Sequence, residues 1–313
     1  MLRYIALRIL SALPVMFVVA VVVFGILYLA PGDPAAALAG DNASPADIAR
    51  VRASLGLDRP FYIQFVIWLW NVVQGNLGSS LFDGKPVLGM IVARVEPTLS
   101  LMVLTILMTV VVAIPLGVAA ASRINSVTDR IAMSLSVLAF SVPVYVVGYA
   151  LILGLSMGLH WFPVQGYVTF GEDVGGWLRS ITLPSLAMAA SYVALVARMT
   201  RTTLADILTN DYIRTARSKG IAPWRITYIH ALRNAAVPIT TVIGSGIAML
   251  IGGAVVTESV FGIPGIGKLT IDSISKRDIP VIQGVVLTAS FVYVFINLLL
   301  DILYKWLDPR IQY

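Results

Sequence analysis

Charged residues are scarce in this chain of 313 residues. Asp, Glu, Lys and Arg make up 12% of it, whereas a soluble globular domain carries about 25%. Cysteine is absent, which excludes disulfides, thiolate nucleophiles and cysteine metal sites. What is abundant is apolar: hydrophobic residues make up 58%, and the mean hydropathy is +0.88. This balance predicts an integral membrane protein.

Patterns that carry catalysis are also missing. The chain contains neither H-E-x-x-H nor G-x-S-x-G, which are typical of zinc peptidases and serine hydrolases. The only two histidines, His160 and His230, fall in different loops and do not form a metal site together. Acids, which a proton pump or an intramembrane protease would need, are almost absent from the apolar stretches. We therefore expect no catalytic, cofactor-binding or metal site in this chain.

Six apolar stretches predict membrane spans. They cover residues 9–30, 98–121, 131–155, 181–197, 235–257 and 279–303. A helix needs about 20 residues to cross the ~30 Å hydrocarbon core. The fourth stretch is short and rich in Ala and Ser, which favours a helix packed inside a bundle. Pro115, Pro143 and Pro184 lie within spans and should kink them.

The first apolar stretch admits a second interpretation. Arg3 and Arg8 precede it, and A-x-A-like sites follow at residues 35–39, as in a secretory signal. The apolar part of a signal is about 7–15 residues long, and this stretch is longer. Its length favours an uncleaved membrane anchor.

The segment after the first span should be ordered. Ser44-Pro45-Ala46-Asp47 resembles a capping box with Pro at the first helical position, and Gly56 should end that helix. The aromatic run Phe61–Val73 reaches only ~20 Å as a helix, which is too short to span the membrane. We expect it to lie at the outer membrane surface. If it did span, every later loop would change sides.

The distribution of charge predicts the orientation. With the N-terminus inside, 13 of the 22 basic residues and five of the 16 acids fall in inner segments, so the inside carries +8 and the outside −2. An excess of Lys and Arg inside is the usual pattern for membrane proteins. It places both termini in the cytoplasm, and it accounts for the pI of about 9.6 without a nucleic-acid role.

Residues 210–238 form a basic, polar segment between two spans. The pattern of residues 212–219 predicts a short helix, and either Asn210 or Asp211 can cap its start. Gly220 is placed to end it in the left-handed conformation. Pro223 suits the start of a second helix that runs towards Arg233. A structured, charged loop at this position is more often a docking element than a tether.

This segment resembles the coupling motif of ABC importer permeases, E-A-A, three residues, Gly, about nine residues and I-x-L-P. Arg214-Thr215-Ala216 stands at E-A-A, Gly220 at the glycine, and Ala231-Leu232-Arg233-Asn234 with Pro238 closes the pattern. The Arg departs from the general consensus. However, R-T-A-R-x-K-G followed by H-x-L-R-N-A is the form usual in the dipeptide/oligopeptide/nickel permease family.

Further landmarks extend the resemblance over nearly the whole chain, in the order of a dipeptide permease B-type subunit. They are Pro31-Gly32-Asp33-Pro34, Leu55-Gly56-Leu57-Asp58-Arg59-Pro60, Phe261-Gly262-Ile263-Pro264-Gly265-Ile266-Gly267, Arg277-Asp278-Ile279-Pro280-Val281-Ile282-Gln283 and Asp308-Pro309-Arg310. The resemblance implies an all-α, six-transmembrane-helix, type I ABC importer permease bundle. Residues 1–97 would form the first span and an extracytoplasmic helical insertion. Residues 98–313 would form a five-helix core whose coupling loop is 201–235.

The same resemblance implies a function and partners. The chain would be the permease subunit of an ATP-driven importer that moves di- or oligopeptides across the bacterial inner membrane. Its partners would be a homologous second permease, two cytosolic ATPase subunits that bind ATP and Mg, and an extracytoplasmic substrate-binding protein. Nickel, glutathione, opines or oligosaccharides are alternative cargoes. A membrane scaffold without transport is the alternative of a different class.

Three partners are physically possible for the basic segment: the groove of a cytosolic ATPase, an anionic lipid surface, or DNA read by a helix-turn-helix. The resemblance favours the ATPase. The residues predicted to contact it are Tyr212, Arg214, Thr215, Ala216, Arg217, Lys219, Gly220 and Pro223. Among them, Ala216 would permit a close approach of the partner and the basic side chains would pair with acids.

Hydroxyl and amide groups in the spans are candidates for the translocation pathway. They are Ser141, Tyr145, Tyr149, Ser191, Tyr192, Thr241, Ser245 and Asn297. Such groups bridge neighbouring helices more often than they line a path.

The loop between the last two predicted spans nearly fits the phosphate-binding pattern G-x-x-x-x-G-K-[ST]. Leu269 replaces the hydroxyl that would hold Mg²⁺, and no strand precedes the loop, so we expect no nucleotide there. By resemblance the loop would contact the binding protein, and a loop that only caps the bundle is the alternative. The predicted contact residues are Phe261, Gly262, Ile263, Pro264, Gly265 and Ile266.

Overall fold

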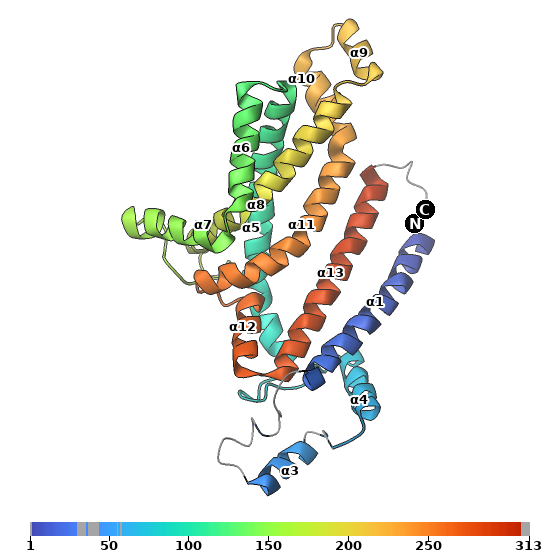
Figure 1. The fold of residues 1–313 in the computed structure, drawn as a ribbon, viewed down its shortest axis with the longest axis vertical. Helices are drawn as coiled ribbons and strands as arrows, with labels where there is room; N and C mark the ends of the chain where they lie inside the picture. Colours follow the sequence, from blue (N-terminus) through green and yellow to red (C-terminus); the bar gives the residue numbers. More distant parts are fainter. Residues whose placement is uncertain (1, 30–35, 37–43, 55, 57, 308–313) are drawn as a thin grey trace. The chain divides into compact units, whose positions relative to one another are not determined.

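The computed structural model describes residues 2–29, 36, 44–54, 56 and 58–307. The chain divides into two compact units (Figure 1). Unit 1 comprises residues 1–95 and 268–298, and unit 2 comprises residues 96–267 and 299–313. Three helices run through the divisions between the units: α5 (Val87–Ser122), α12 (Ile266–Lys276) and α13 (Ile279–Leu307).

Unit 1 contains the N-terminal helices, which are α1 (Leu2–Leu29), α3 (Pro45–Ser54) and α4 (Phe61–Val73). Helices α1 and α4 pack through aromatic rings, with Phe24 lying 5.4 Å from Phe65 and 5.3 Å from Trp68 between ring centroids. The bounds predicted for α4 are confirmed. Its position at a membrane surface stays a prediction.

The capping box of α3 is confirmed. The backbone N–H and hydroxyl of Ser44 donate to Asp47 Oδ2 at 3.2 and 2.6 Å, and Asp47 N–H donates to Ser44 Oγ at 3.2 Å. These bonds to the ionised carboxyl hold the pKa of Asp47 below its ordinary value. After the helix, Gly56 has a φ of +67°, which is the left-handed conformation predicted for it.

Unit 2 is a helical bundle. In chain order it contains the later part of α5, then α6 (Val127–Ser141), α7 (Val144–Leu151) continued by η1 (Ile152–Gly158), α8 (Val174–Ile207), α9 (Asp211–Ser218), α10 (Pro223–Arg225), η2 (Ile226–Ala231) and α11 (Leu232–Val260). Helix α8 packs against α6, α7 and α11, and 72% of its most apolar window is buried. This confirms that the fourth predicted span is an interior helix.

Small residues let the helices of unit 2 approach one another closely. A Cβ added at Gly117 of α5 would lie 2.5 Å from Thr200 Cβ on α8. A Cβ at Gly246 of α11 would lie 2.0 Å from the Tyr192 ring, again on α8.

The prediction of a short fourth span was wrong, because the 34-residue helix α8 continues through polar residues at both ends of its apolar stretch.

The third predicted span is broken rather than kinked. Helices α6 and α7 meet at an angle of 98° around Val142 and Pro143. Proline lacks an N–H and disfavours the helical conformation in the residue before it, and Val142 is accordingly extended, with φ −87° and ψ 124°. Helices α5 and α8 continue through Pro115 and Pro184.

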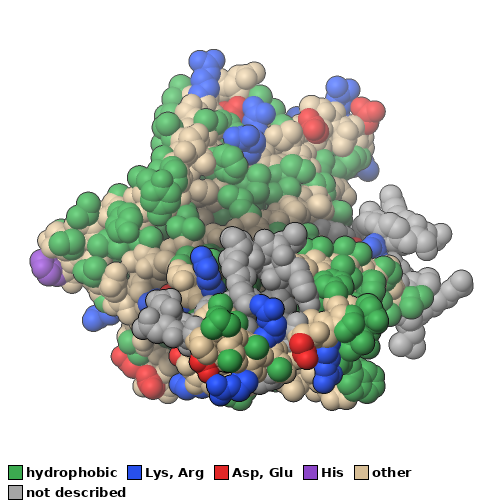
Figure 2. Space-filling view, turned by 60° about the horizontal axis from the view of Figure 1, so that its bottom comes forward, with side chains coloured by type: hydrophobic (Ala, Val, Ile, Leu, Met, Phe, Trp, Pro, Cys, Tyr) green, Lys and Arg blue, Asp and Glu red, His purple; other side chains and the backbone are tan. Residues whose placement is uncertain are grey.

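Within the described residues, four helical stretches are long and apolar enough to cross a membrane, and the bent α6–α7 pair would make a fifth. The four are Val87–Ser122, Val174–Ile207, Pro223–Val260 and Ile279–Leu303. The described part of α1 contributes a shorter apolar helix, Leu10–Gly25. Many large apolar side chains of these helices are exposed, as expected for surfaces that meet lipid. Figure 2 shows apolar side chains interspersed with basic and acidic ones on the face that it draws. The count of six spans stays a prediction.

Candidate functional site

The basic segment begins where α8 ends at Ile207. A short turn follows, in which Thr209 Oγ1 donates to the carbonyl of Asp206 at 2.7 Å. Helix α9 then starts after Asn210, whose backbone is extended. The side chain of Asn210 makes no capping bond. Instead its carbonyl accepts from the N–H groups of Ile213 and Arg214 at 3.0 and 3.2 Å. The predicted helix is confirmed, but the predicted side-chain cap by Asn210 is wrong.

Helix α9 has one buried and one exposed face. Ile213 and Ala216 are buried in the core of unit 2. The predicted contact residues Tyr212, Arg214, Thr215, Arg217, Lys219, Gly220 and Pro223 are exposed. Ala216 therefore packs α9 against its own bundle, and the close approach of a partner at this residue stays a prediction. The exposed face is basic and carries three cations.

Gly220 and Pro223 adopt the roles predicted for them. Gly220 has a φ of +73°, and among the described residues no side chain or backbone atom outside its neighbours lies within 4 Å of an added Cβ. The N–H of Gly220 donates to Arg217 O at 3.0 Å and that of Ile221 to Ala216 O at 3.3 Å, which closes α9. Pro223 then opens α10.

The second helix does not end near Arg233. Residues Pro223–Val260 form one apolar helical stretch of 38 residues, through α10, η2 and α11. Polar Arg233 and Asn234 made the span seem to begin at residue 235, but a helix backbone continues through exposed polar residues without penalty. Asn234 Nδ2 donates to the Tyr212 hydroxyl at 3.0 Å and to His230 O at 2.8 Å. This pair fastens α9 directly to the start of α11.

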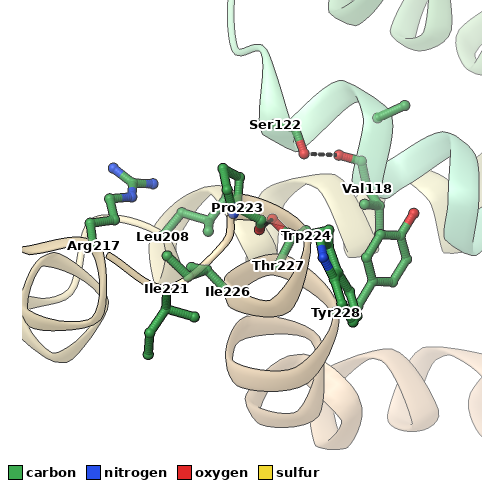
Figure 3. A pocket seen from close by; sticks show the side chains of 11 residues that line it. Val118, Ser122, Leu208, Arg217, Ile221, Pro223, Trp224, Ile226, Thr227 and Tyr228 are labelled. Carbon is green, nitrogen blue, oxygen red and sulfur yellow. Dashed lines mark hydrogen bonds between the residues drawn. The ribbon is translucent and has the colours of Figure 1, made fainter. Parts of the chain in front are cut away.

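A pocket of about 560 Å³ opens beside the basic segment (Figure 3). Its lining residues are Val118, Ala119, Ser122, Leu208, Arg217, Ile221, Pro223, Trp224, Ile226, Thr227 and Tyr228. Trp224 and Tyr228 are more than half exposed, and the Arg225 guanidinium lies 5.3 Å from the centre of the Trp224 ring. Exposed aromatic rings next to cations are typical of surfaces that bind another protein.

The candidate pathway residues do not gather into one site. Ser191 and Tyr192 of α8 line a cavity of about 300 Å³ together with Met188, Met249 and residues around the α6–α7 break. Ser191 Oγ donates to Ala139 O at 3.3 Å, and the Tyr192 hydroxyl donates to Ile243 O, so both bridge helices.

The other six candidates are not among the residues that line this cavity. Tyr145 and Tyr149 are exposed on α7. Four side chains donate to carbonyls of their own helices: Ser141, Thr241, Ser245 and Asn297. A role in the pathway stays a prediction for all eight residues.

The loop that follows α11 folds inward. Phe261 and Ile263 are 3% and 0% exposed, and Pro264 is exposed. An added Cβ at Gly265 would lie 2.2 Å from the carboxyl of Glu258, which is fully buried. Gly265, which lies between the two glycines of the near-phosphate pattern, therefore makes room for the Glu258 carboxyl. In this structure the loop caps the bundle, and contact with a binding protein stays a prediction.

Thr98 completes this arrangement, and neither it nor Glu258 was among the predicted site residues. Thr98 Oγ1 donates to Glu258 Oε1 at 2.6 Å and accepts from Ile266 N–H at 2.9 Å. The signal available in the sequence was an acid at the end of an apolar stretch, followed by a glycine-rich loop.

A second polar network joins α5 to the loop before α8. The Tyr167 hydroxyl donates to Glu96 Oε1 at 3.1 Å and lies 3.1 Å from Ser100 Oγ, which accepts from Trp177 Nε1 at 3.2 Å. Burial raises the pKa of Tyr167, so the hydroxyl keeps its proton and remains a donor. These partners are far apart in sequence, and no local pattern indicated them.

Comparison with known proteins identifies the family. Residues 113–313 match the binding-protein-dependent transport system inner membrane component, and residues 1–113 match the N-terminal part of the membrane component of such systems. The chain belongs to this family. It is therefore a permease subunit of an ABC importer and an inner membrane protein, and its family works with ATPase and substrate-binding partners.

The relatives cover the whole chain. A protein of Sinorhizobium fredii named "Probable peptide ABC transporter permease protein y4tP" is 46% identical over 99% of both chains. The glutathione transport system permease protein GsiC of Salmonella typhi is 40% identical over 100% of both. Among solved structures, a chain of the MetNI methionine ABC transporter matches with a TM-score of 0.57, at 17% identity, over 70% of this chain and 96% of that one. This match confirms the all-α importer permease fold.

Proposed function

We propose that this subunit carries short peptides across the inner membrane. The proposal is supported by full-length relatives named for peptide transport, at 46% identity in Sinorhizobium fredii and 44% in Brucella abortus. The relative named for glutathione at 40% identity points to the same chemical class, because glutathione is itself a tripeptide. Nickel, opines and oligosaccharides have no such support.

The mechanism is inferred from one observation: α9 presents a basic face and is packed against the helical bundle of unit 2. Ile213 and Ala216 hold α9 to the bundle, while Arg214, Arg217 and Lys219 remain exposed. The Tyr212–Asn234 bond ties α9 to α11, which is continuous with α10. A protein that pushes on α9 would therefore move a membrane helix rather than bend a loop.

The proposed assembly is supported by the family and by the distribution of charge. The α9 end of unit 2 and both termini lie in the cytoplasm, as the excess of basic residues in those segments indicates. Two cytosolic ATPase subunits bind ATP and Mg, and one of them docks on α9 and on the Trp224–Tyr228 pocket. A homologous second permease completes the translocation path, and an extracytoplasmic binding protein delivers the peptide. This chain holds no nucleotide and catalyses no reaction.

Docking is tested by reversing the basic face. The variant Arg214→Glu/Arg217→Glu/Lys219→Glu is co-expressed with the ATPases, and their co-purification is measured against the native chain. We expect the ATPases to be lost while membrane insertion is kept, because like charges would then face acids of the partner. Arg179→Glu, an exposed change at the opposite end of α8, is the control and should retain them. Retention of the ATPases by the triple variant would exclude α9 as the docking element.

The cargo is tested by uptake in vesicles that contain the purified complex. Labelled dipeptides, tripeptides, glutathione and Ni²⁺ are offered with the binding protein and ATP. Peptide uptake that stops without ATP supports the proposal. Uptake of Ni²⁺ alone would exclude peptides as cargo, and uptake of none in an assembled complex would support a scaffold.

A further inference from the structure

An ion pair between a buried carboxylate and a partly exposed guanidinium joins α6 to α8 near the point where α8 leads to α9. Arg201 Nε donates to Asp129 Oδ1 at 3.0 Å, and Arg201 Nη2 donates to Asp129 Oδ2 at 2.7 Å. The side chain of Asp129 is 5% exposed and that of Arg201 is 26% exposed. This two-bond geometry fixes the orientation of both groups as well as their separation.

The pair also fixes the turn between α5 and α6. Asn125, in the left-handed conformation with φ 62°, donates its N–H to Asp129 Oδ2 at 2.9 Å. Ser126 caps α6 by accepting from the N–H of Asp129. On the other side, Gly117 allows α5 to touch Thr200, the neighbour of Arg201. The turn after α5, the start of α6 and the later part of α8 therefore meet at one carboxylate.

Stability alone does not explain such a pair. Removing the Asp129 carboxylate and much of the Arg201 side chain from water is costly, and an apolar replacement of similar volume often serves stability as well. Charged pairs of this kind are better understood as devices that select one relative position of two elements. An exposed pair on α9 provides the contrast: Arg214 and Asp211 are 74% and 95% exposed and lie 3.4 Å apart.

We propose that Asp129 and Arg201 are positioning residues that pass the movement of α9 to α6. Helix α8 reaches α9 through only three residues, 208–210, so a displacement of α9 is applied to the end of α8. The ion pair makes the start of α6 follow. Beyond α6 lies the 98° break at Pro143, where α7 borders the cavity lined by Ser191 and Tyr192. This inference rests on the proposed docking of an ATPase at α9.

The first test removes the charge and keeps the volume. In the assembled complex, Asp129→Asn should leave ATPase co-purification and ATP hydrolysis close to native, while peptide uptake per ATP falls about tenfold. Arg50→Gln, which breaks the exposed Arg50–Asp47 pair on α3, should leave uptake per ATP unchanged. If Asp129→Asn transports with native efficiency, the ion pair has no role in coupling.

The second test replaces the ion pair with a covalent link. Because the chain contains no cysteine, Asp129→Cys/Arg201→Cys can be joined specifically by a short thiol cross-linker when the partner subunits lack accessible cysteines. We expect the unlinked variant to hydrolyse ATP without efficient uptake, and the linked one to recover most of it. Failure of the link to restore uptake would overturn the positioning role.

A third measurement does not depend on transport. Spin labels at the exposed positions Val127→Cys and Thr202→Cys report the separation of α6 and α8. With the native ion pair we expect a narrow distribution of distances, and with Asp129→Asn a broader one. An unchanged distribution of distances would show that the Asp129–Arg201 ion pair does not fix the separation of α6 and α8. A broader distribution of distances together with native peptide uptake would show that the ion pair fixes the separation of α6 and α8. It would also overturn the proposal that the pair passes the movement of α9 to α6.

Discussion

Two glycine-bearing turns flank the continuous helical stretch Pro223–Val260, one at each end. At the first end, Gly220 closes α9 with a φ of +73°, and an added Cβ there would meet open space among the described residues. At the second end, Gly265 and Gly267 have ordinary φ values but no room, because an added Cβ would lie 2.2 Å from Glu258 and 2.5 Å from the backbone of Val255. The first glycine is needed for its conformation and the second pair for its size.

The difference matches the surroundings of each turn. The turn at Gly220 lies among exposed aromatic and basic side chains, and its backbone is held mainly by its own hydrogen bonds. The loop with Gly265 is held by buried Phe261, Ile263 and Glu258. We infer that the first turn is shaped to present a surface to another protein, and the second to seal the bundle against itself.

Gly267→Ala should have the largest effect. Its methyl group would collide with the Val255 Cα at 2.5 Å, and backbone cannot rotate away as a side chain can. Overpacking of this kind costs about 3 kcal/mol. We expect a lower yield of monodisperse protein and a fall of several degrees in the melting temperature of the purified complex. Gly252→Ala is the control, because Gly252 lies in α11 and an added Cβ there has no atom of the described residues within 4 Å. A native melting temperature for Gly267→Ala would disprove the close approach.

Gly265→Ala should destabilise somewhat less, because the group it meets is a side chain. The collision is with the Glu258 carboxyl, so the two positions should be coupled. We expect Glu258→Ala to be destabilising alone, and the cost of Gly265→Ala to be smaller in its presence. The double-mutant cycle, measured by melting temperature, reports this coupling. Strictly additive changes would mean that Glu258 is not what excludes a side chain at Gly265.

Thr98→Val should have an intermediate effect. Valine keeps the shape but removes a donor to Glu258 and an acceptor for Ile266 N–H. Leaving a buried polar group short of a partner costs about 2 kcal/mol. The matched control is Thr105→Val, because Thr105 Oγ1 donates only to Leu101 O of its own helix, at 2.7 Å. If both variants melt at the same temperature, Thr98 does not hold the loop.

The contrast between the turns also explains what the sequence could predict. The α9 turn is local: Gly220 and Pro223, only three positions apart, specify the left-handed end of one helix and the start of the next. The bounds of α4 and the capping box at Ser44 were predictable for the same reason. Family resemblance supplied the bundle.

What could not be predicted depends on residues distant in sequence. Glu258 meets Thr98 across 160 residues, and Asp129 meets Arg201 across 72. Composition showed only that these groups lie near the ends of apolar stretches. The burial of Ala216 and the continuity of α10 with α11 likewise depend on packing against the bundle. A hydropathy pattern shows which stretch of a chain is apolar, and the helix that contains this stretch can be much longer than the stretch itself.

Gly220→Ala should have the smallest effect on stability and a specific effect on coupling. An alanine in the left-handed conformation costs about 1 kcal/mol, but nothing collides with its methyl group. Asparagine tolerates this conformation better, so Gly220→Asn should cost less than Gly220→Ala. Because the strain falls on the turn alone, we expect both complexes to melt close to the native temperature. Peptide-stimulated ATP hydrolysis should follow the order native, then Gly220→Asn, then Gly220→Ala. If Gly220→Ala lowered the melting temperature as much as Gly267→Ala, the proposed difference between the turns would be wrong. The space next to Gly220 would then be occupied by other atoms, as it is next to Gly267.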